Sequence, residues 1–248
     1  MAKLGKDPIG EELRAHLQQS GLPGKYLLTQ EGSNTGTALI LVDWKGRNLI
    51  GVAPGANHSL TQEEVRSFPE LFEWGEVLLC QLEVPLPAVV AALGSARERG
   101  MVTVLNPAPV RSLPQETLRL VDVITPNETE AMLLAGMGSE GETQDAARRL
   151  QGMGPSRVIV TMGERGAMSL MEDQLTFFPP YHVQPVDTTG CGDAFNGALA
   201  CALAEGKSIA EAVPFANAAG ALAATVRGAQ SSMPWREQIL TLVKTGGG

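Results

Sequence analysis

The residue types best suited to chemistry lie together in one segment, from Val186 to Gly197. A strand end there runs into a glycine-rich turn that opens an apolar helix. Glycines let backbone amides approach a ligand closely, and a helix start adds unpaired N–H groups with a partial positive charge. Such a site suits a phosphoryl group that gains charge during transfer. Asp193 lies at the same point, where its carboxylate could accept the proton of an attacking hydroxyl.

The same turn also has a simpler interpretation. A lone Gly-x-Gly-Asp is a short motif with many chance matches, and Asp193 could be only a charge at a helix start. A second phosphate-like motif, Gly206-Lys207-Ser208, resembles the end of a P-loop. We reject it, because Cys201 stands where the P-loop needs its first glycine and the motif follows a helix. The choice between the two interpretations of Asp193 therefore depends on the rest of the chain.

The elements that must position this segment alternate between short apolar strands and helices. Strands are expected over 76–82, 102–105, 121–124 and 157–161, and helices over 87–99 and after Asn127, Gly190 and Ser208. This alternation predicts an α/β fold with a mostly parallel sheet covered by helices on both faces. Ligands of such sheets bind at the carboxyl ends of the strands.

The first part of the chain has a different pattern. Asp7 and Pro8 predict a helix start, and apolar residues then recur every four positions until Gly21. A β-hairpin is expected over 35–56, with its turn at 44–47.

Composition and charge exclude several classes of function. The chain has 248 residues, 44% of them hydrophobic, and a net charge of -8, which argues against a nucleic-acid surface. Cys80, Cys191 and Cys201 form no CxxC pair, so neither a zinc site nor a disulfide framework is expected. No apolar run reaches the length of a membrane span. We therefore expect a cytoplasmic protein with no nucleic-acid or membrane partner.

Several segments, taken together, resemble the ribokinase-like (PfkB) family of carbohydrate kinases. Residues 187–193 are similar to the C-terminal signature of that family, and 127–130 to its NxxE motif. Further stretches resemble the ribokinases in particular: 81–83, 106–109, 125–130 and 228–232. The resemblance covers nearly the whole chain, in order. It implies one Rossmann-type α/β domain over 1–248, with the hairpin over 35–56 as part of a small β lid above the sugar.

The resemblance also implies an activity and a role for particular residues. The activity would be ATP-dependent phosphorylation of a sugar's primary hydroxyl, D-ribose to D-ribose 5-phosphate. Asp193 would be the catalytic base, and Glu83 and Asp193 would bind the sugar. An anion hole would be formed by the amides of Gly190, Cys191, Gly192 and Asp193. The magnesium–ATP site would include Asn127, Glu130, Thr161, Gly163, Gly166, Gly192 and Asn217. An activating potassium ion would be surrounded by Asp187, Thr189, Ala223, Val226, Gly228 and Ser232, many of them through backbone carbonyls.

Several of these residues have a structural alternative. Asn127 could simply cap the following helix, and Glu83 could be a solvated loop acid. Asn217 could be a surface polar residue, and Thr161 could be only a strand residue. Cys191 stands where the family usually has a smaller residue. Its thiol pKa could be lowered by the helix-start amides, or the side chain could be an inert space-filler.

The resemblance also implies a strand–helix portion ahead of Met1, with sugar-binding polar residues and a Gly-Gly-Lys-Gly-Ala-Asn-like stretch. We therefore expect an N-terminally incomplete kinase domain, and a homodimer through the lid for a chain that carries that portion. Two alternatives stay open. One is a kinase for deoxyribose, another pentose or a hexose, and the other is a nucleotide-binding pseudokinase without turnover.

Overall fold

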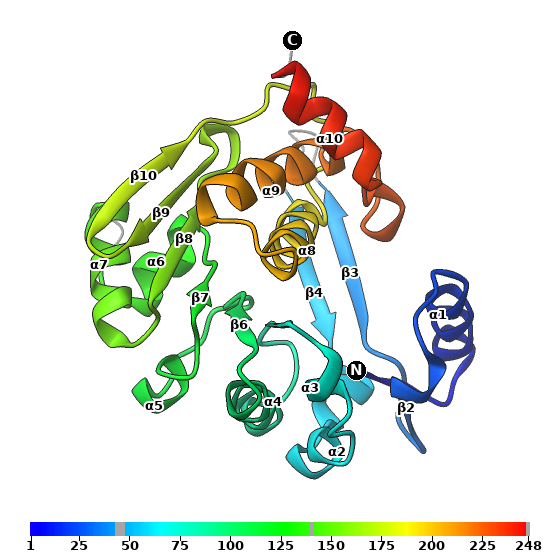
Figure 1. Cartoon of the computed structure of the whole chain (residues 1–248). Coiled ribbons are helices and arrows are strands. Elements are labelled where there is room, and N and C mark those ends of the chain that lie inside the picture. The colour runs from blue at the N-terminus through cyan, green and yellow to red at the C-terminus, as the bar shows by residue number, and fades with distance from the viewer. Residues whose placement is uncertain (43–47, 139–140, 247–248) are drawn as a thin grey trace. The chain divides into compact units, whose positions relative to one another are not determined.

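The computed structural model describes residues 1–42, 48–138 and 141–246 (Figure 1). The chain divides into two compact units. The first consists of Met1–Pro69 and Leu82–Ala92, and the second of Glu70–Gln81 and Leu93–Gly248. Helix α4, Leu86–Glu98, passes from the first unit into the second.

Helix α1, Pro8–Gln19, begins in the first unit where the sequence predicts. The Asp7 carboxylate accepts a hydrogen bond from the Gly10 N–H at 2.8 Å, a cap that typically contributes about 1 kcal/mol. The same carboxylate accepts the Thr35 N–H at 2.7 Å and the Thr35 hydroxyl at 2.6 Å. These three bonds lower the pKa of Asp7 below its ordinary value. Asp7 therefore ties the helix start to the beginning of the expected hairpin.

A short parallel pair of strands precedes and follows α1. Strand β1, Ala2–Gly5, pairs with β2, Leu27–Gln30, and the sequence patterns did not predict β1. Lys3, within β1, is 5% exposed, and its ammonium donates to the Ser59 carbonyl at 2.9 Å and to Glu64 Oε1 at 2.6 Å. The buried charge is therefore both paired and hydrogen-bonded, as burial of an ammonium requires.

The expected hairpin is present. Strands β3, Thr37–Val42, and β4, Asn48–Ala53, pair antiparallel as a separate two-stranded sheet. The turn predicted at 44–47 lies outside the described residues. Leu39 and Val52 are 66% and 65% exposed. The hairpin is thus confirmed as a structural element, while its role as a lid stays a prediction.

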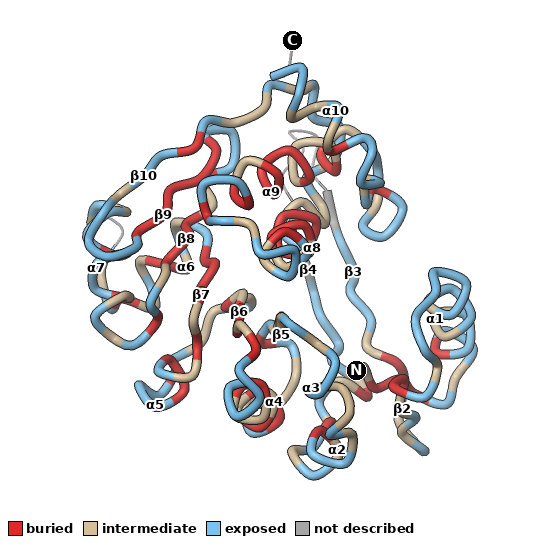
Figure 2. The backbone as a smooth tube through the Cα atoms, in the orientation of Figure 1, coloured by how far each residue is buried: buried red, intermediate tan, exposed pale blue. Residues whose placement is uncertain are grey.

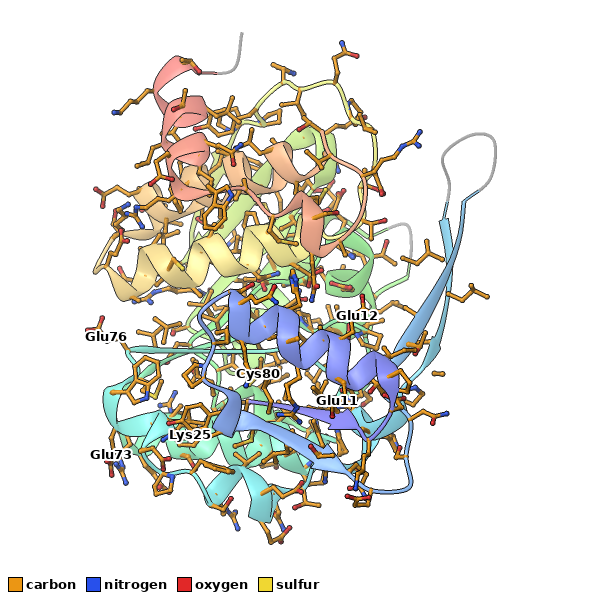
Figure 3. All side chains as sticks on the ribbon, turned by 90° about the vertical axis from the view of Figure 1, so that its right-hand side faces the viewer. Glu11, Glu12, Lys25, Glu73, Glu76 and Cys80 are labelled. Carbon is orange, nitrogen blue, oxygen red and sulfur yellow. The ribbon has the colours of Figure 1, made fainter. Side chains whose placement is uncertain are left out.

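The first unit is completed by three short helical segments: η1 (Gly24–Tyr26), η2 (Gly55–Ser59) and α2 (Gln62–Arg66). Charged side chains cover its surface, among them Glu11, Glu12 and Lys25 (Figure 3). The Lys25 ammonium lies 4.5 Å from the centre of the Tyr26 ring.

The second unit contains a six-stranded sheet in the order β10-β9-β8-β7-β6-β5 (Figure 1). Its strands are β5 (Val77–Cys80), β6 (Val102–Leu105), β7 (Val123–Ile124), β8 (Arg157–Thr161), β9 (Ala167–Met171) and β10 (Gln174–Phe178). Strands β5 to β8 run parallel, while β9 and β10 pair antiparallel. The predicted α/β class is confirmed, with a mixed sheet that includes an unpredicted hairpin.

Helices cover this sheet on both faces. The helical segments of the unit are α3 (Leu71–Trp74), α5 (Gln115–Leu118), α6 (Glu128–Leu134), α7 (Thr143–Met153), η3 (Gly163–Arg165), α8 (Cys191–Ala204), α9 (Ile209–Ala223), η4 (Gln230–Ser232) and α10 (Arg236–Thr245). Figure 1 shows α8 and α9 on one face and α6 and α7 on the other. In the part of the chain that the structure describes, no helix has the length and apolar character needed to cross a membrane.

The core of the second unit lies between the sheet and helices α8 and α9 (Figure 2). Val104, Val123 and Ile159 on the central strands are fully buried, as expected for strands covered on both faces. Helix α9 approaches α8 closely at Gly220, where an added Cβ would lie 3.3 Å from the Cys191 carbonyl oxygen. Cys80 is the last residue of β5, an edge strand of the sheet (Figure 3). Burial raises the pKa of its thiol to about 12.

Candidate active site

The glycine-rich turn begins helix α8, as predicted. Gly190 is its N-cap residue, with φ of 79°, a left-handed conformation that favours glycine. A Cβ at this position would also lie 3.1 Å from Met233 Cε and 3.3 Å from Ala229 Cα. The backbone conformation therefore favours glycine here, and the close approach of Met233 and Ala229 adds to that preference.

The amides of this turn are not equivalent. The Cys191 N–H donates to the Thr188 carbonyl at 3.3 Å, a long bond within the turn. The N–H groups of Gly192 and Asp193 belong to the first turn of α8, where no preceding helical carbonyl exists to accept them. Of the four amides predicted to form the anion hole, Gly192 and Asp193 are therefore the best placed donors.

Asp193 lies in the first turn of α8 and its residue is exposed. Partial desolvation by the surrounding protein raises the pKa of its carboxyl above the ordinary value. A carboxylate with a raised pKa is a stronger base than a fully solvated one. The turn thus places a proton acceptor beside two amide donors.

Asp187 connects two segments that the resemblance assigns to a cation site. Its Oδ1 accepts the Thr189 N–H at 2.9 Å, and its Oδ2 accepts the Gly228 N–H at 2.9 Å. These bonds, led by the one from Gly228, lower its pKa to about 2. The backbone N–H of Asp187 also donates to the Ala224 carbonyl at 3.1 Å.

The remaining predicted cation residues lie at the end of α9, where Ala223 is the last helical residue, and on the segment that follows it. The Ala223 carbonyl accepts the Val226 N–H at 3.2 Å, and the buried Ser232 hydroxyl donates to the Ala229 carbonyl at 2.7 Å. The groups available here are carboxylate, hydroxyl and backbone carbonyl oxygens, the ligands that hard cations prefer. The structure thus supports a loop of suitable oxygen chemistry.

Asn127 and Glu130 form a capping box at the start of α6. Asn127 Oδ1 accepts the Glu130 N–H, and a Glu130 carboxylate oxygen accepts the Asn127 N–H, both at 2.9 Å. Burial raises the pKa of Glu130. The capping alternative for Asn127 is therefore confirmed. It leaves open a nucleotide role, because capping uses the side-chain oxygen and the Nδ2 group is a separate donor.

Strand β8 brings Thr161 beside Asn127. The Thr161 N–H donates to the Pro126 carbonyl at 3.0 Å, and Asn127 and Thr161 form a parallel bridge. The chain then turns through η3, which contains Gly163. Gly166 ends this turn with φ of 85°, and a Cβ there would lie 2.2 Å from the Phe178 carbonyl oxygen.

Asn217 lies on α9 and is only 9% exposed. Its Nδ2 donates to the Pro179 carbonyl at 3.2 Å. The alternative of a surface polar residue is therefore wrong, since the amide is buried and anchored to the segment after β10. This segment is the same one that Gly166 approaches.

Of the two alternatives for Cys191, the one with a lowered thiol pKa is wrong. Desolvation by burial, followed by the negative charges of Asp187 and Asp193, raises the pKa of this thiol. The helix-start amides do not outweigh these effects, because the nearby charges are both carboxylates.

Glu83 belongs to the first unit, where it is exposed shortly after the end of β5. Its predicted sugar contact stays a prediction. Among the residues that the structure describes, no three His, Cys, Asp or Glu side chains gather into a metal site. A magnesium ion held jointly with nucleotide phosphates needs only one or two carboxylates, so the Glu130 carboxylate would be a suitable protein contribution.

The structure also shows a buried connection that sequence reasoning did not assign. The Thr125 hydroxyl donates to Asn196 Oδ1 at 2.6 Å, and Asn196 Nδ2 donates to the Gly192 carbonyl at 2.8 Å. One signal could have identified Asn196: it is an amide flanked by the buried apolar residues Phe195 and Ala198 of the same helix.

Known proteins are similar to this chain over most of its length. The family described as pfkB family carbohydrate kinase matches residues 1–236. The chain belongs to this family. It is 37% identical to the ribokinase of Haemophilus influenzae over 243 residues, 97% of this chain and 79% of that protein. It is 33% identical to the deoxyribokinase of Salmonella typhi over 241 residues, 96% of this chain and 79% of that protein.

A solved structure of a family member agrees with the fold. The structure of Arabidopsis thaliana ribokinase complexed with ribose and ATP matches with a TM-score of 0.89 at 29% identity. It covers 98% of this chain and 81% of that one. The predicted resemblance to ribokinase-like kinases and the predicted fold are thus confirmed, and the protein is an ATP-dependent carbohydrate kinase by family.

Proposed function

We propose that this carbohydrate kinase transfers the γ-phosphoryl group of ATP to the primary hydroxyl of D-ribose, giving D-ribose 5-phosphate. The observation that carries the proposal is the start of α8, where the Asp193 carboxylate, with its raised pKa, lies in the same turn as the Gly192 and Asp193 amides. The similarity to ribokinases, one of them solved with ribose and ATP, supports the choice of sugar and phosphoryl donor.

The chemical step follows from these groups. Asp193 accepts the proton of the sugar hydroxyl as that oxygen attacks the γ-phosphorus. The new O–P bond forms while the bond from the γ-phosphorus to the β–γ bridging oxygen breaks, and that electron pair leaves with ADP. The amides of Gly192 and Asp193, with Gly190 and Cys191 beside them, donate to the transferred phosphoryl oxygens. Such fixed donors act where negative charge develops, which is the main requirement of phosphoryl transfer.

The nucleotide is held, in this proposal, by residues from the neighbouring strand ends. Asn127 and Glu130 act at the triphosphate end, where bound magnesium supplies positive charge against the phosphate oxygens. Thr161, Gly163, Gly166 and Asn217 line the rest of the nucleotide site. The pairing of Thr161 with Asn127 supports this grouping.

A potassium ion is proposed for the loop that Asp187 organises. Its ligands would come from Asp187, Thr189, Ala223, Val226, Gly228 and Ser232. The oxygen character of these groups and the bonds from Asp187 to Thr189 and Gly228 support the site. A bound ion would hold this loop in one conformation. Because Ala229 and Met233 of the loop lie close to Gly190, the ion would also restrict the conformation of the turn at Gly190.

Further parts of the proposal concern the sugar and a second subunit. Glu83 would hydrogen-bond the sugar hydroxyls, and the hairpin β3–β4 would act as a lid. The exposed Leu39 and Val52 on that hairpin support a homodimer through this element. Free cysteines at positions 80, 191 and 201 fit a reducing compartment such as the cytoplasm.

The second candidate is a kinase for 2-deoxyribose, which the similarity to a deoxyribokinase favours. Sugar-dependent ADP release, measured with ribose, 2-deoxyribose, fructose and no sugar, separates the candidates. We expect the largest kcat/KM for ribose, and phosphorus–proton correlation in the product at the primary carbon. A preference for 2-deoxyribose would move the assignment to the second candidate. Magnesium–ATP binding without sugar-dependent ADP release would instead show a nucleotide-binding protein without kinase activity.

A further inference from the structure

A buried chain of hydrogen bonds joins the two elements to which the proposed function assigns the phosphates. Thr125 lies just beyond β7 and is 1% exposed, and Asn196 lies on α8 and is 4% exposed. The Thr125 hydroxyl donates to Asn196 Oδ1 at 2.6 Å, and Asn196 Nδ2 donates to the Gly192 carbonyl at 2.8 Å. A single amide side chain thus links a strand end to the first turn of α8.

The chemistry of the partners fixes the orientation of the Asn196 amide. A backbone carbonyl can only accept, so the group facing Gly192 must be the NH₂. The hydroxyl of Thr125 then donates to the amide oxygen. A further hydrogen bond holds the backbone of Thr125, since Asn106 Nδ2 donates to the Thr125 carbonyl at 2.9 Å.

The carbonyl that Asn196 holds belongs to the same peptide group as the Asp193 N–H. A trans peptide is planar, with its C=O and N–H pointing in opposite directions. Fixing the Gly192 carbonyl from inside the protein therefore fixes the direction in which the Asp193 N–H points outward. A carbonyl that accepts an additional hydrogen bond also polarises its amide and strengthens that N–H as a donor.

The other end of the connection reaches the capping box of α6. Thr125 is followed by Pro126, whose carbonyl accepts the Thr161 N–H at 3.0 Å, and then by Asn127. The position of Thr125 is thus tied to the backbone that carries Asn127. The connection therefore sets the spacing between the start of α6 and the start of α8.

We propose that Asn196, held by Thr125, is a positioning residue for phosphoryl transfer. It directs the Asp193 N–H toward the transferred group. It also keeps a fixed distance between the anion-hole turn and the Asn127–Glu130 box. This proposal rests on the proposed function of the same site. Because the aligned amide matters most when charge develops on the phosphoryl group, the proposal concerns kcat more than the binding of ATP.

The first test replaces Thr125 by Val, which keeps the shape and removes the hydroxyl. We expect Thr125→Val to lower kcat about 10- to 100-fold, since small misplacement of reacting groups costs that much. The dissociation constant for magnesium–ADP should change little. Thr125→Ser, which keeps the hydroxyl, should recover most of the lost kcat. Thr103→Val is the matched control: Thr103 is also fully buried and hydrogen-bonded, at 2.7 Å to the Leu120 carbonyl, but it lies on the amino-terminal half of β6.

The second test uses Asn196 itself and a pH profile. In Asn196→Asp, an ionised carboxylate would face the Gly192 carbonyl, whereas a protonated carboxyl could donate to it. We expect kcat of this variant to fall as pH rises through the pKa of the buried carboxyl, a basic limb that the parent lacks. In Asn196→Leu, kcat should fall as in Thr125→Val, and the double variant should lose no more than either single one.

The outcomes separate the two proposals. If Thr125→Val and Thr103→Val have equal kcat, or if Asn196→Asp shows no new basic limb, Asn196 is only structural. If the parent transfers phosphoryl to no sugar, the proposed function fails. Positioning is then tested by binding of magnesium–ADP with aluminium fluoride, a mimic of the transferred group. Asn196→Leu should weaken this binding but not that of magnesium–ADP alone, and equal losses for both would overturn the proposal.

Discussion

The Gly228 N–H donates to Asp187 Oδ2 at 2.9 Å, across 41 positions of the sequence. The other carboxylate oxygen accepts the Thr189 N–H at the same distance. One carboxylate therefore joins the segment that leads into α8 to the loop that follows α9. A Cβ at Gly190 would lie 3.3 Å from Ala229 Cα, so the same loop also lies close to the glycine-rich turn that begins α8.

Asp187→Asn should make folding less sensitive to acid. The carboxyl of Asp187 has its pKa lowered from 3.8 to about 2, so it contributes stability that is fully present above its ordinary pKa and is lost as pH falls through about 2. The amide cannot accept both N–H groups, so the variant should be less stable at pH 6. The difference between variant and parent in the free energy of unfolding should shrink between about pH 4 and pH 2. Asp145→Asn, at an exposed position on α7, is the control. A difference that is constant over this range would contradict the assigned pKa.

Potassium should raise kcat, and Asp187→Asn should remove most of that effect. A cation among the carboxylate, hydroxyl and carbonyl oxygens of the loop would order the Ala229 backbone against which Gly190 packs. The measurement compares initial rates in potassium chloride and in tetramethylammonium chloride at equal ionic strength. Equal rates in the two salts would exclude the cation site.

Local chemistry made much of the fold predictable. The cap at Asp7 set the start of α1, and the β-branched and apolar run Val-Thr-Val-Leu over 102–105 matches the observed bounds of β6. The hairpin β9–β10 was missed because its turn uses Glu172 and Asp173 at positive φ, 50° and 61°, without the glycine that usually marks such turns. Strand β1 was missed because it is short and contains Lys3, whose burial depends on Ser59 and Glu64, residues distant in sequence.

The site shows the same division between local and distant interactions. The turn at Gly190 and the box at Asn127 are contiguous motifs, so their residues were predictable. The pairing of Thr125 with Asn196 spans 71 positions, and nothing in either neighbourhood specifies the other partner. The sequence could not decide between the two alternatives for Cys191 for a similar reason, because the thiol pKa depends on burial and on two carboxylates whose distances the sequence does not give.

Asp193→Asn should abolish most turnover while leaving nucleotide binding intact. The amide cannot accept the hydroxyl proton, and loss of a general base typically lowers the rate about 10²- to 10⁴-fold. In the proposed site, the triphosphate contacts come instead from backbone amides and from the Asn127–Glu130 box. Turnover and the dissociation constant of magnesium–ADP are measured on the same preparation, with Asp145→Asn as the control. A variant with parental kcat would remove Asp193 from the mechanism.

The pH dependence of kcat/KM should show an acid limb that belongs to Asp193. Proton transfer needs the ionised carboxylate, and desolvation raises its pKa above 3.8, so activity should fall as pH drops through a value above that. Assays from pH 4.5 upward, within the range where circular dichroism shows the native fold, measure the limb. In Asp193→Asn the residual rate should lack it. An identical limb in that variant would assign the ionisation to another group.

Cys191 should react slowly with iodoacetamide at neutral pH, and Asp193→Asn should make it react faster. Burial and the carboxylates of Asp187 and Asp193 raise the pKa of this thiol, so little of the reactive thiolate is present. Removing the Asp193 charge removes one of these causes, which lowers the pKa and increases the thiolate fraction.

Peptide mapping of the modified protein measures this reactivity, with the exposed Cys201 in the same sample as an internal reference for reagent and time. Because Cys191 lies in the proposed anion-hole turn, magnesium–ATP and ribose together should slow its labelling but not that of Cys201. If Asp193→Asn left the Cys191 rate unchanged, the two side chains would not interact as their placement in one helical turn requires. If magnesium–ATP and ribose did not slow the labelling of Cys191, the start of α8 would not be the site of phosphoryl transfer.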